Sequence, residues 1–336
     1  MKLIVAVCAM AKKSKSKPMQ KILKQLKKNG DYEIIVFSEE MILKKPIEEW
    51  PKCDALMTFF SGDFPLEKVQ QYIQLTSCWS VNDMNFQNVL FDRMSIYSRL
   101  TKIGVKTPKY LVINTKDSKE LIEKENYIEY KDKRIYKPFV EKPVSSEDHN
   151  IWIYHSKEQG GGSTKLFRKS ERSANCERSS ERSKNSQIRK NGTYLYEEFI
   201  NPENLFDIKV YAVGENYAYA EKRRVPFAQE FLDVNTKNQH RQKVELTDLE
   251  REYARKIVQT FHQNVCGFDI LRDHKGRSYV IDINGWSLVN SSISDEYFQK
   301  CGQILNDLFI QNCSKIENQN KKSKKRKIPF EQNIYV

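Results

Sequence analysis

KPFVEKPVSSEDHNIWIYHSKEQGGGSTKLFRK, residues 137–169, is the stretch that says most about the fold. Residues 151–154 are β-branched or aromatic and favour a strand, while the glycines at 160–162 predict a turn. Lys142, His149 and the pair Arg168 and Lys169 place cationic side chains on and beside two expected strands. Cations on a sheet, next to backbone amides that no side chain covers, suit a polyphosphate ligand.

The composition predicts a soluble, globular chain with an anionic partner. Of the 336 residues, 39% are hydrophobic and 30% are charged, which fits one large domain or two to three small ones. The net charge is +13, but the segment QNKKSKKRK at 319–327 supplies much of the excess. The interleaved aromatic residues of a single-strand binder are not evident, so nucleic acid is not expected as a partner.

The seven cysteines form no CxxC motif and no Cys/His pattern typical of zinc. They predict reduced thiols and a cytoplasmic protein, with the nucleus as a further location if the basic segment is an import signal. The start, MKLIVAVCAMA, is similar to a signal peptide, but the alternative is a buried first strand of a parallel sheet. No apolar run is long enough to span a bilayer, so no membrane partner is expected.

Predicted strands and helices alternate over residues 1–105, which indicates an α/β domain. Residues 3–10, 34–37 and 55–60 read as buried strands, and 66–75 read as a helix. A basic loop at 12–17 follows the first strand, and Pro18 opens the next helix. This loop lies at the carboxyl edge of the sheet, where such folds bind ligands.

The remainder of the chain is predominantly β. Strands are expected at 110–113, 127–130, 134–136, 140–143, 151–154, 194–199, 208–213 and 217–220. Residues 170–192 are rich in Ser, Arg, Glu, Lys and Asn and predict a mobile insertion between strands. A helix over 246–263 and a hairpin of 265–271 with 278–283 follow, and residues 313–336 read as a disordered basic tail.

The predicted hairpin carries a candidate metal site. Asp282 and Asn284 are two residues apart in a strand and share one face, and Asp269 on the partner strand can join them. Oxygen ligands of this kind suit Mg²⁺. The alternative is that Asp and Asn simply end a strand.

Two lysines lie inside otherwise apolar strands. Lys142 stands in VEKPV and Lys209 in DIKVY. Because lysine almost never enters a sheet unpaired, each must face either solvent or an anion.

Two strand lysines, a glycine turn, YEEF at 196–199 and a carboxylate–Asn hairpin together resemble the ATP-grasp superfamily. More narrowly, VCAMAKKSKSKPM at 7–19, YLYEEF at 194–199, DIKVYAVG at 207–214 and VCGFDILR at 265–272, with two motifs from 137–169, resemble the diphosphoinositol pentakisphosphate kinases. The similarity runs in order from about residue 3 to about 310. It implies an α/β (α+β) chain: an N-terminal α/β domain, then an ATP-grasp fold of two antiparallel sheets enclosing the nucleotide.

The resemblance also implies domains at 106–200 and 201–312, and assigns roles by position. ATP contacts would come from Arg93, Lys142, His149, Glu197, Glu198, Ile200, Asp207 and Lys209. Magnesium would be held by Asp269, Asp282 and Asn284. The inositol polyphosphate would meet Lys12, Lys13, Arg168, Lys169, Lys209, Arg223, Arg241 and Ser287, and the catalytic candidates are Lys209, Arg223 and Asp282.

The implied activity is transfer of the ATP γ-phosphate to a phosphate, by resemblance the 1-phosphate, of inositol hexakisphosphate or 5-diphosphoinositol pentakisphosphate. Two positions depart from the family: its substrate-side lysine is Asn290 here, and an arginine expected between Arg223 and Arg241 has no clear match. An ATP-grasp carboxylate–amine ligase is an alternative, but it needs fewer converging cations. A non-catalytic inositol polyphosphate sensor is another, but it needs no magnesium ligands. A monomer is expected.

Overall fold

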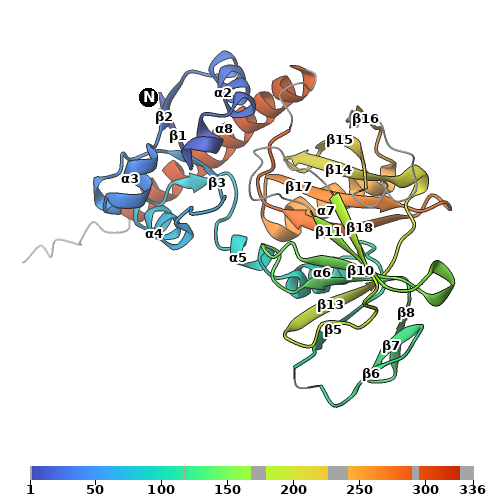
Figure 1. Cartoon of the computed structure of the whole chain (residues 1–336). Helices are drawn as coiled ribbons and strands as arrows, with labels where there is room; N and C mark the ends of the chain where they lie inside the picture. The colour runs from blue at the N-terminus through green and yellow to red at the C-terminus, as the bar shows by residue number, and fades with distance from the viewer. Residues whose placement is uncertain (1, 117, 168–178, 226–240, 290–294, 326–336) are drawn as a thin grey trace, which may run out of the picture. The chain divides into compact units, whose positions relative to one another are not determined.

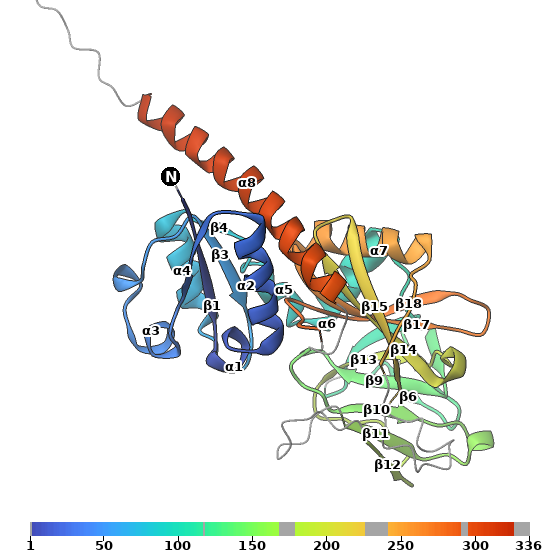
Figure 2. The same ribbon diagram turned by 90° about the horizontal axis from the view of Figure 1, so that it is seen from above.

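The computed structural model describes residues 2–116, 118–167, 179–225, 241–289 and 295–325. The chain divides into two compact units, residues 1–84 with 288–336 and residues 85–287, whose elements are labelled in Figures 1 and 2. This differs from the predicted boundaries at two places. Residues 85–105 join the second unit, and residues 288–312 join the first.

The first unit is built on a parallel sheet in the order β2-β1-β3-β4. Its strands are β1 (Leu3–Ala9), β2 (Tyr32–Val36), β3 (Ala55–Phe59) and β4 (Trp79–Ser80). All five residues of β3 are buried, as the continuous apolar run requires of a strand covered on both faces. The α/β prediction for the start of the chain is confirmed, and MKLIVAVCAMA contains a buried strand.

Helices cover this sheet. They are α1 (Ala11–Ser14), α2 (Lys17–Asn29), α3 (Glu39–Lys44), α4 (Leu66–Thr76) and α8 (Asp295–Lys325). Phe309 of α8 makes edge contacts with Tyr32 and Trp79 at ring distances of 5.8 Å, which explains why α8 belongs to this unit. The helix continues to Lys325, so the prediction of a disordered tail from residue 313 was wrong for that part.

The second unit contains a six-stranded antiparallel sheet in the order β12-β11-β10-β9-β13-β5. Its strands are β5 (Tyr110–Asn114), β9 (Phe139–Pro143), β10 (Ile151–Tyr154), β11 (Ser163–Phe167), β12 (Ser179–Ser183) and β13 (Thr193–Glu198). A small sheet of β6 (Leu121–Glu123), β7 (Tyr127–Tyr130) and β8 (Lys133–Tyr136) packs beside it.

Part of the predicted insertion at 170–192 has regular structure. β12 pairs with β11, and Ile188 is buried in the cluster that contains Phe139, Tyr154 and Tyr196. The prediction of a mobile insertion was therefore wrong for residues 179–192. Few apolar residues suffice here because a single isoleucine reaches the core.

A five-stranded antiparallel sheet, β16-β15-β14-β17-β18, completes the unit. Its strands are β14 (Phe206–Val213), β15 (Tyr217–Arg224), β16 (Gln242–Lys243), β17 (Val265–Arg272) and β18 (Ser278–Asn284). One face packs in a common core with α5 (Gln87–Leu90), α6 (Arg93–Lys102) and α7 (Asp248–Phe261). The two antiparallel sheets of the predicted ATP-grasp fold are thus present, and the predicted hairpin is β17–β18.

The helices and the cysteines bear on the sequence-based expectations of no membrane span and no disulfide. Among the described helices, none is both long and apolar enough to cross a membrane. Six cysteines lie in described parts of the chain (8, 53, 78, 266, 301 and 313); all are buried and none of these forms a disulfide. The redox state of these thiols stays a prediction.

Candidate active site

The candidate site is one polar face of the five-stranded sheet. Side chains alternate along β14, so Ile208, Val210 and Ala212 enter the core beneath α7. Asp207 and Lys209 therefore point to the opposite face, where both are buried, with 3% and 8% of their surface exposed. The lysine does not interrupt the core, because it occupies the face that the core does not use.

An ion network joins neighbouring strands on this face. Asp269 of β17 lies opposite Lys209 in register, and its Oδ1 is 2.9 Å from the lysine Nζ. The same oxygen is 3.1 Å from Nη2 of Arg223, whose Nε donates to Asp207 Oδ1 at 2.8 Å. Burial opposes the charge of Arg223, but the carboxylates of Asp269 and Asp207 prevail and raise its pKa above the ordinary value. The Arg223 guanidinium therefore stays charged, and Lys209 shares the same carboxylate.

The predicted metal ligands come together at the β17–β18 pair. Asp269 and Asp282 face each other in register, and a bulge follows Asp269. Asn284 lies two residues beyond Asp282, and its amide donates to Asp282 Oδ2 at 3.1 Å. The set offers two carboxylates and one amide oxygen, which are hard oxygen donors suited to Mg²⁺, provided that waters or phosphates complete the shell. The described residues contain no cluster of three His, Cys, Asp or Glu side chains suited to a metal.

Ser287 reaches this face over a glycine. A Cβ on Gly267 would lie 2.5 Å from Ser287 Oγ and 3.2 Å from Lys209 Cε, so only glycine allows these two side chains to approach. The predicted substrate serine thus stands beside the predicted catalytic lysine.

Arg241 is held to the same face by a buried acid. Its Nη1 lies 3.4 Å from Glu221 Oε2, and Tyr211 also donates to that oxygen at 3.5 Å. Burial raises the pKa of Glu221, while Arg241 lowers it. Burial likewise raises the pKa of Tyr211 to about 12, so the phenol stays protonated near neutral pH. Sequence reasoning did not find Glu221 or Tyr211. Tyr211 could have been found because it lies two residues after Lys209 on one strand and so shares its face, whereas Glu221 joins them only through the strand register.

Lys142 lies on the face of the six-stranded sheet that is turned towards β18. Its Nζ is 2.6 Å from Glu197 Oε1 and donates to the carbonyl of Ile281 at 3.1 Å. The hydroxyl of Tyr97, on α6, donates to Glu197 and accepts from Lys142 at 3.2 Å. Burial and the nearby Glu197 raise the pKa of Tyr97 well above its ordinary value. Tyr97 was missed from sequence because it lies far from its partners along the chain.

Arg93 fixes the turn after β9. Its guanidinium is 3% exposed and donates to the carbonyls of Pro143 and Ser145, each at 2.6 Å. Further bonds reach Asp148 O at 3.2 Å and Ser146 O at 3.3 Å. His149 is half-buried in this same turn. A contact between Arg93 and a phosphate therefore stays a prediction that would require some of these bonds to be exchanged.

The remaining predicted ATP residues follow β13. Glu198 ends the strand and is half-buried, and Ile200 is buried just beyond it. Lys12 and Lys13 belong to the first unit, where they lie on the short helix α1 rather than on the predicted loop. Arg168, Lys169 and Asn290, and the stretch in which the extra arginine was sought, lie outside the described residues.

The glycine turn is not the anion cradle that the sequence suggested. The amide of Gly160 donates to Lys157 O at 2.9 Å and that of Gly161 to Ser156 O at 2.8 Å. The amide of Gly162 donates to Ser186 Oγ at 2.8 Å. A Cβ on Gly162 would lie 2.3 Å from the carbonyl oxygen of Ser183. Gly162 therefore permits the close approach of the end of β12, and the amides of all three glycines are already used.

Comparisons with known proteins agree with this architecture. Residues 3–92 match the family described as the diphosphoinositol pentakisphosphate kinase 2 N-terminal domain, and residues 172–305 match the RimK-like ATP-grasp domain. The chain is 42% identical over 313 residues to inositol hexakisphosphate and diphosphoinositol-pentakisphosphate kinase 2 of Mus musculus, covering 92% of this chain and 27% of that protein. The Saccharomyces cerevisiae inositol hexakisphosphate and diphosphoinositol-pentakisphosphate kinase is 37% identical over 349 residues, covering 94% and 29%. The chain thus spans about a quarter of the length of the curated relatives it matches.

Solved structures show the same fold at low sequence identity. D-alanine–D-alanine ligase from Bacillus anthracis has a TM-score of 0.55 at 14% identity, covering 95% of this chain and 100% of that one. The ATP-grasp ligase PsnB complexed with minimal precursor has a TM-score of 0.54 at 12% identity, covering 92% and 98%. These likenesses establish the fold alone. By its sequence, the chain belongs to the diphosphoinositol pentakisphosphate kinase family, with that family's N-terminal domain in residues 3–92 followed by an ATP-grasp fold.

Proposed function

We propose that this chain is a magnesium- and ATP-dependent kinase that phosphorylates an existing phosphate of inositol hexakisphosphate or 5-diphosphoinositol pentakisphosphate. The observation that carries the proposal is the polar face of the five-stranded sheet, where Lys209 and Arg223 lie beside Asp269. The names and identities of the relatives support the substrate class. By resemblance, the phosphate modified is the 1-phosphate.

ATP would lie between the two antiparallel sheets, as the fold implies. Lys142 is supported there by Glu197 and Tyr97, so its side-chain nitrogen is held in one place. Because the side chain is already held in place, little further side-chain entropy is lost when a phosphate binds to it. Glu198, Ile200 and Asp207 would surround the adenosine, with Arg93 and His149 near the phosphates.

Asp269, Asp282 and Asn284 would hold magnesium through their oxygen atoms. When bound, the ion neutralises charge on the transferred phosphoryl group. Lys209 then has a second role, because it lies beside Asp269 on one side and Ser287 on the other. This position suits a lysine that contacts both ATP and the acceptor.

The reaction needs no side-chain base. An oxygen of the acceptor phosphate, already ionised near neutral pH, attacks the γ-phosphorus of ATP. The bond from that phosphorus to the β,γ-bridging oxygen breaks, and ADP leaves with the bond's electron pair. Lys209 and Arg223 would hold the two reacting groups in line and offset their charge, which is most of what catalysis of phosphoryl transfer requires.

The acceptor would also contact Lys12, Lys13, Arg168, Lys169, Arg241 and Ser287 as part of this proposal. Asn290 and the missing arginine reduce the number of cations, so the preference between the two acceptors can differ from that of relatives. We further propose a monomer that acts in the cytoplasm, and in the nucleus if residues 321–327 serve as an import signal. The buried thiols support a reducing compartment.

Phosphorus NMR tests the activity directly. The protein is incubated with Mg-ATP and inositol hexakisphosphate, and new pyrophosphate signals are expected together with ADP. The absence of any such signal, for both acceptors, would defeat the proposal. Binding of the inositol phosphate without turnover would instead support the sensor, and ADP release only with a carboxylate and an amine would support the ligase.

A further inference from the structure

A polar pocket lies on the other face of the six-stranded sheet. It has a volume of about 490 Å³ and is lined by residues of the small sheet, the end of β5 and the segment 186–190. Leu121, which lines the pocket, packs against the core cluster that contains Tyr154, Ile188 and Tyr196. In register, Tyr196 lies opposite Glu141, the neighbour of Lys142, so these tyrosines point away from the face that carries Lys142. The pocket is therefore separate from the candidate active site. We call it the β6–β8 pocket.

A buried lysine lines this pocket. Lys137 is 9% exposed, and its ammonium makes one hydrogen bond to other described residues, to the carbonyl of Ser186 at 3.1 Å. Burial lowers its pKa, while Glu123 and Glu125 act in the opposite direction. An ammonium has three donors, so two remain for another partner. Buried lysines are normally paired with an anion.

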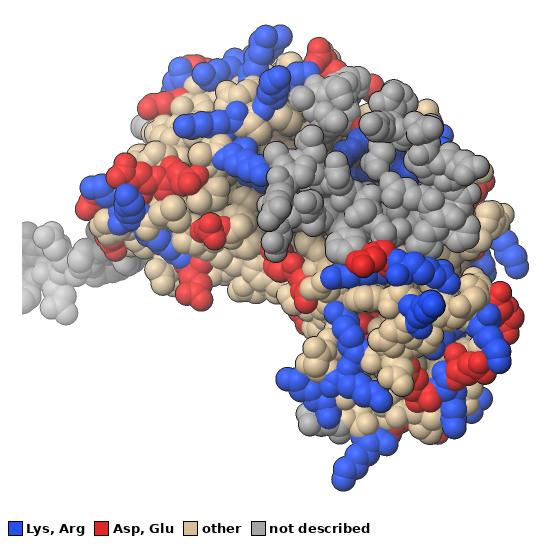
Figure 3. All heavy atoms as spheres, viewed as in Figure 1, with Lys and Arg blue, Asp and Glu red and all other residues tan. Residues whose placement is uncertain are grey.

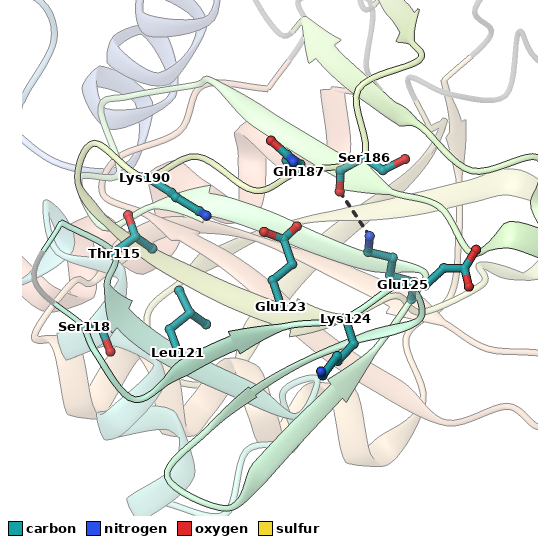
Figure 4. A pocket seen from close by; sticks show the side chains of 10 residues that line it. Thr115, Ser118, Leu121, Glu123, Lys124, Glu125, Ser186, Gln187 and Lys190 are labelled. Atoms are coloured by element: carbon teal, nitrogen blue, oxygen red, sulfur yellow. Dashed lines mark hydrogen bonds between the residues drawn. The ribbon is translucent and has the colours of Figure 1, made fainter.

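Two further lysines line the β6–β8 pocket. Within the described parts of the chain, neither Lys124 nor Lys190 has a carboxylate at ion-pairing distance, and Ser118 Oγ is buried without a hydrogen-bond partner. Figure 4 shows Lys190 and Glu123 directed into the same hollow. In Figure 3, lysine and arginine side chains gather over the lobe that carries the small sheet.

The two acids at the pocket do not balance these lysines. Glu125 pairs with Lys157 at 3.1 Å, outside the pocket lining. Glu123 accepts the amide of Ile188 at 3.0 Å through Oε1. The ammonium groups of Lys137 and Lys190 therefore line the pocket with one carboxylate, Glu123, that is not ion-paired within the described residues, while Figure 4 shows Lys124 directed away from it. The excess of positive charge favours an anion, and the remaining oxygen of Glu123 can accept a hydroxyl group.

We propose that the β6–β8 pocket binds a small phosphate monoester that also carries a hydroxyl group. The phosphate would meet the ammonium groups of Lys137 and Lys190, and the hydroxyl would donate to Glu123. The volume suits a compact ligand, since pockets for small molecules span about 300–1,000 Å³. The inference does not depend on the proposed kinase activity.

Calorimetric titration of the full chain at constant ionic strength tests the proposal, with glycerol 2-phosphate and inorganic phosphate as probes. Saturable binding is expected, with the ester at least as tight as inorganic phosphate. The variant Lys190→Met should weaken ester binding about tenfold or more, because a charge-assisted contact is lost. Glu123→Gln should tighten the binding of inorganic phosphate, because the opposing charge disappears. It should also remove any preference for the ester, because the single amide oxygen accepts from Ile188 and none is left for the hydroxyl.

Two control variants separate this site from other anion binding. Lys119→Met with Lys133→Met removes two exposed lysines that do not line the pocket, and Arg241→Met removes a cation of the candidate active site. Both should leave ester binding unchanged. The proposal is overturned if no saturable binding occurs, if the control variants weaken binding as much as the pocket variant, or if Glu123→Gln weakens the binding of inorganic phosphate.

Discussion

Replacing Glu197 with glutamine would test how the lysine proposed for ATP binding is held in place. The side chains of Lys142 and Glu197 are 5% and 4% exposed, and their charged atoms are 2.6 Å apart. Glutamine keeps the size of the side chain but removes the charge that Lys142 faces. Removing one partner of a buried ion pair costs about 3–5 kcal/mol, because the other charge stays in a low-dielectric site. We therefore expect Glu197→Gln to destabilise residues 85–287 by that amount.

Differential scanning calorimetry can measure this loss. For a unit of about 200 residues, each kcal/mol shifts Tm by about 2–4 °C, so the expected decrease in Tm is roughly 6–20 °C. A matched control is Glu120→Gln, because Glu120 pairs with Lys131 at 3.7 Å in the same unit but is 62% exposed. Exposed pairs contribute about 0–1 kcal/mol, so this control should change Tm by only a few degrees.

The double variant Lys142→Met with Glu197→Gln distinguishes a charge effect from lost packing. Removing the lysine's charge as well should restore at least half of the stability lost in Glu197→Gln, which is a coupling of about 2 kcal/mol or more. Lys142 would not depend on Glu197 if Glu197→Gln lowered Tm no more than the exposed control Glu120→Gln did. The same would follow if the stability losses of Glu197→Gln and Lys142→Met simply added in the double variant. The account of a pre-positioned nucleotide lysine would then be refuted.

Three further predictions concern single residues. Asp282→Ala should abolish turnover and leave the calorimetric Tm close to that of the parent; retained activity in the purified protein would sink the magnesium assignment. Gly162→Ala should lower the free energy of unfolding, measured by urea titration, by more than about 2 kcal/mol, because φ is +75° and the new Cβ would lie 2.3 Å from Ser183 O. Gly160→Ala should cost about half as much, because its new Cβ would lie 3.7 Å from the nearest atom. Equal losses in the two variants would contradict the clash at Gly162. Burial lowers the pKa of His155 from 6.5 to about 4, so its contribution to stability is present above pH 6.5 and is lost as the pH falls towards 4; NMR titration of its ring near pH 6.5 would contradict this.

Local pattern predicted the elements of the second unit well. The β17–β18 hairpin and the facing of Asp269 and Asp282 follow from strand periodicity and one turn, which are short-range properties of the chain. The same periodicity placed Lys209 on a strand. These features could be predicted because each depends on residues close in sequence or in adjacent strands.

Long-range partners could not be predicted in this way. Tyr97 meets Glu197 and Lys142 only because α6 packs against β18 and β13, and nothing in its own segment marks it. The glycine turn failed as a predicted anion site partly for a similar reason. The amide of Gly162 donates to Ser186, in the distant segment after β12, whereas the amides of Gly160 and Gly161 donate to carbonyls of their own turn.

The two strand lysines show what local reasoning lacked. Sequence left two alternatives for each, solvent or an anion, without saying where the anion comes from. The structure places a protein carboxylate at both: Glu197 beside Lys142 and Asp269 beside Lys209. An internal anion lets a lysine stay buried and charged, so stability alone would justify both pairs. Asp269 is different from Glu197, however, because its Oδ1 also meets Arg223 and it lies in register with Asp282. A metal ion held by Asp269 would compete with Lys209 and Arg223 for the charge of that carboxylate. The two cationic side chains would then interact less strongly with Asp269 and could contact a phosphate instead. The proposed metal site and the proposed phosphate site are thus coupled through one side chain.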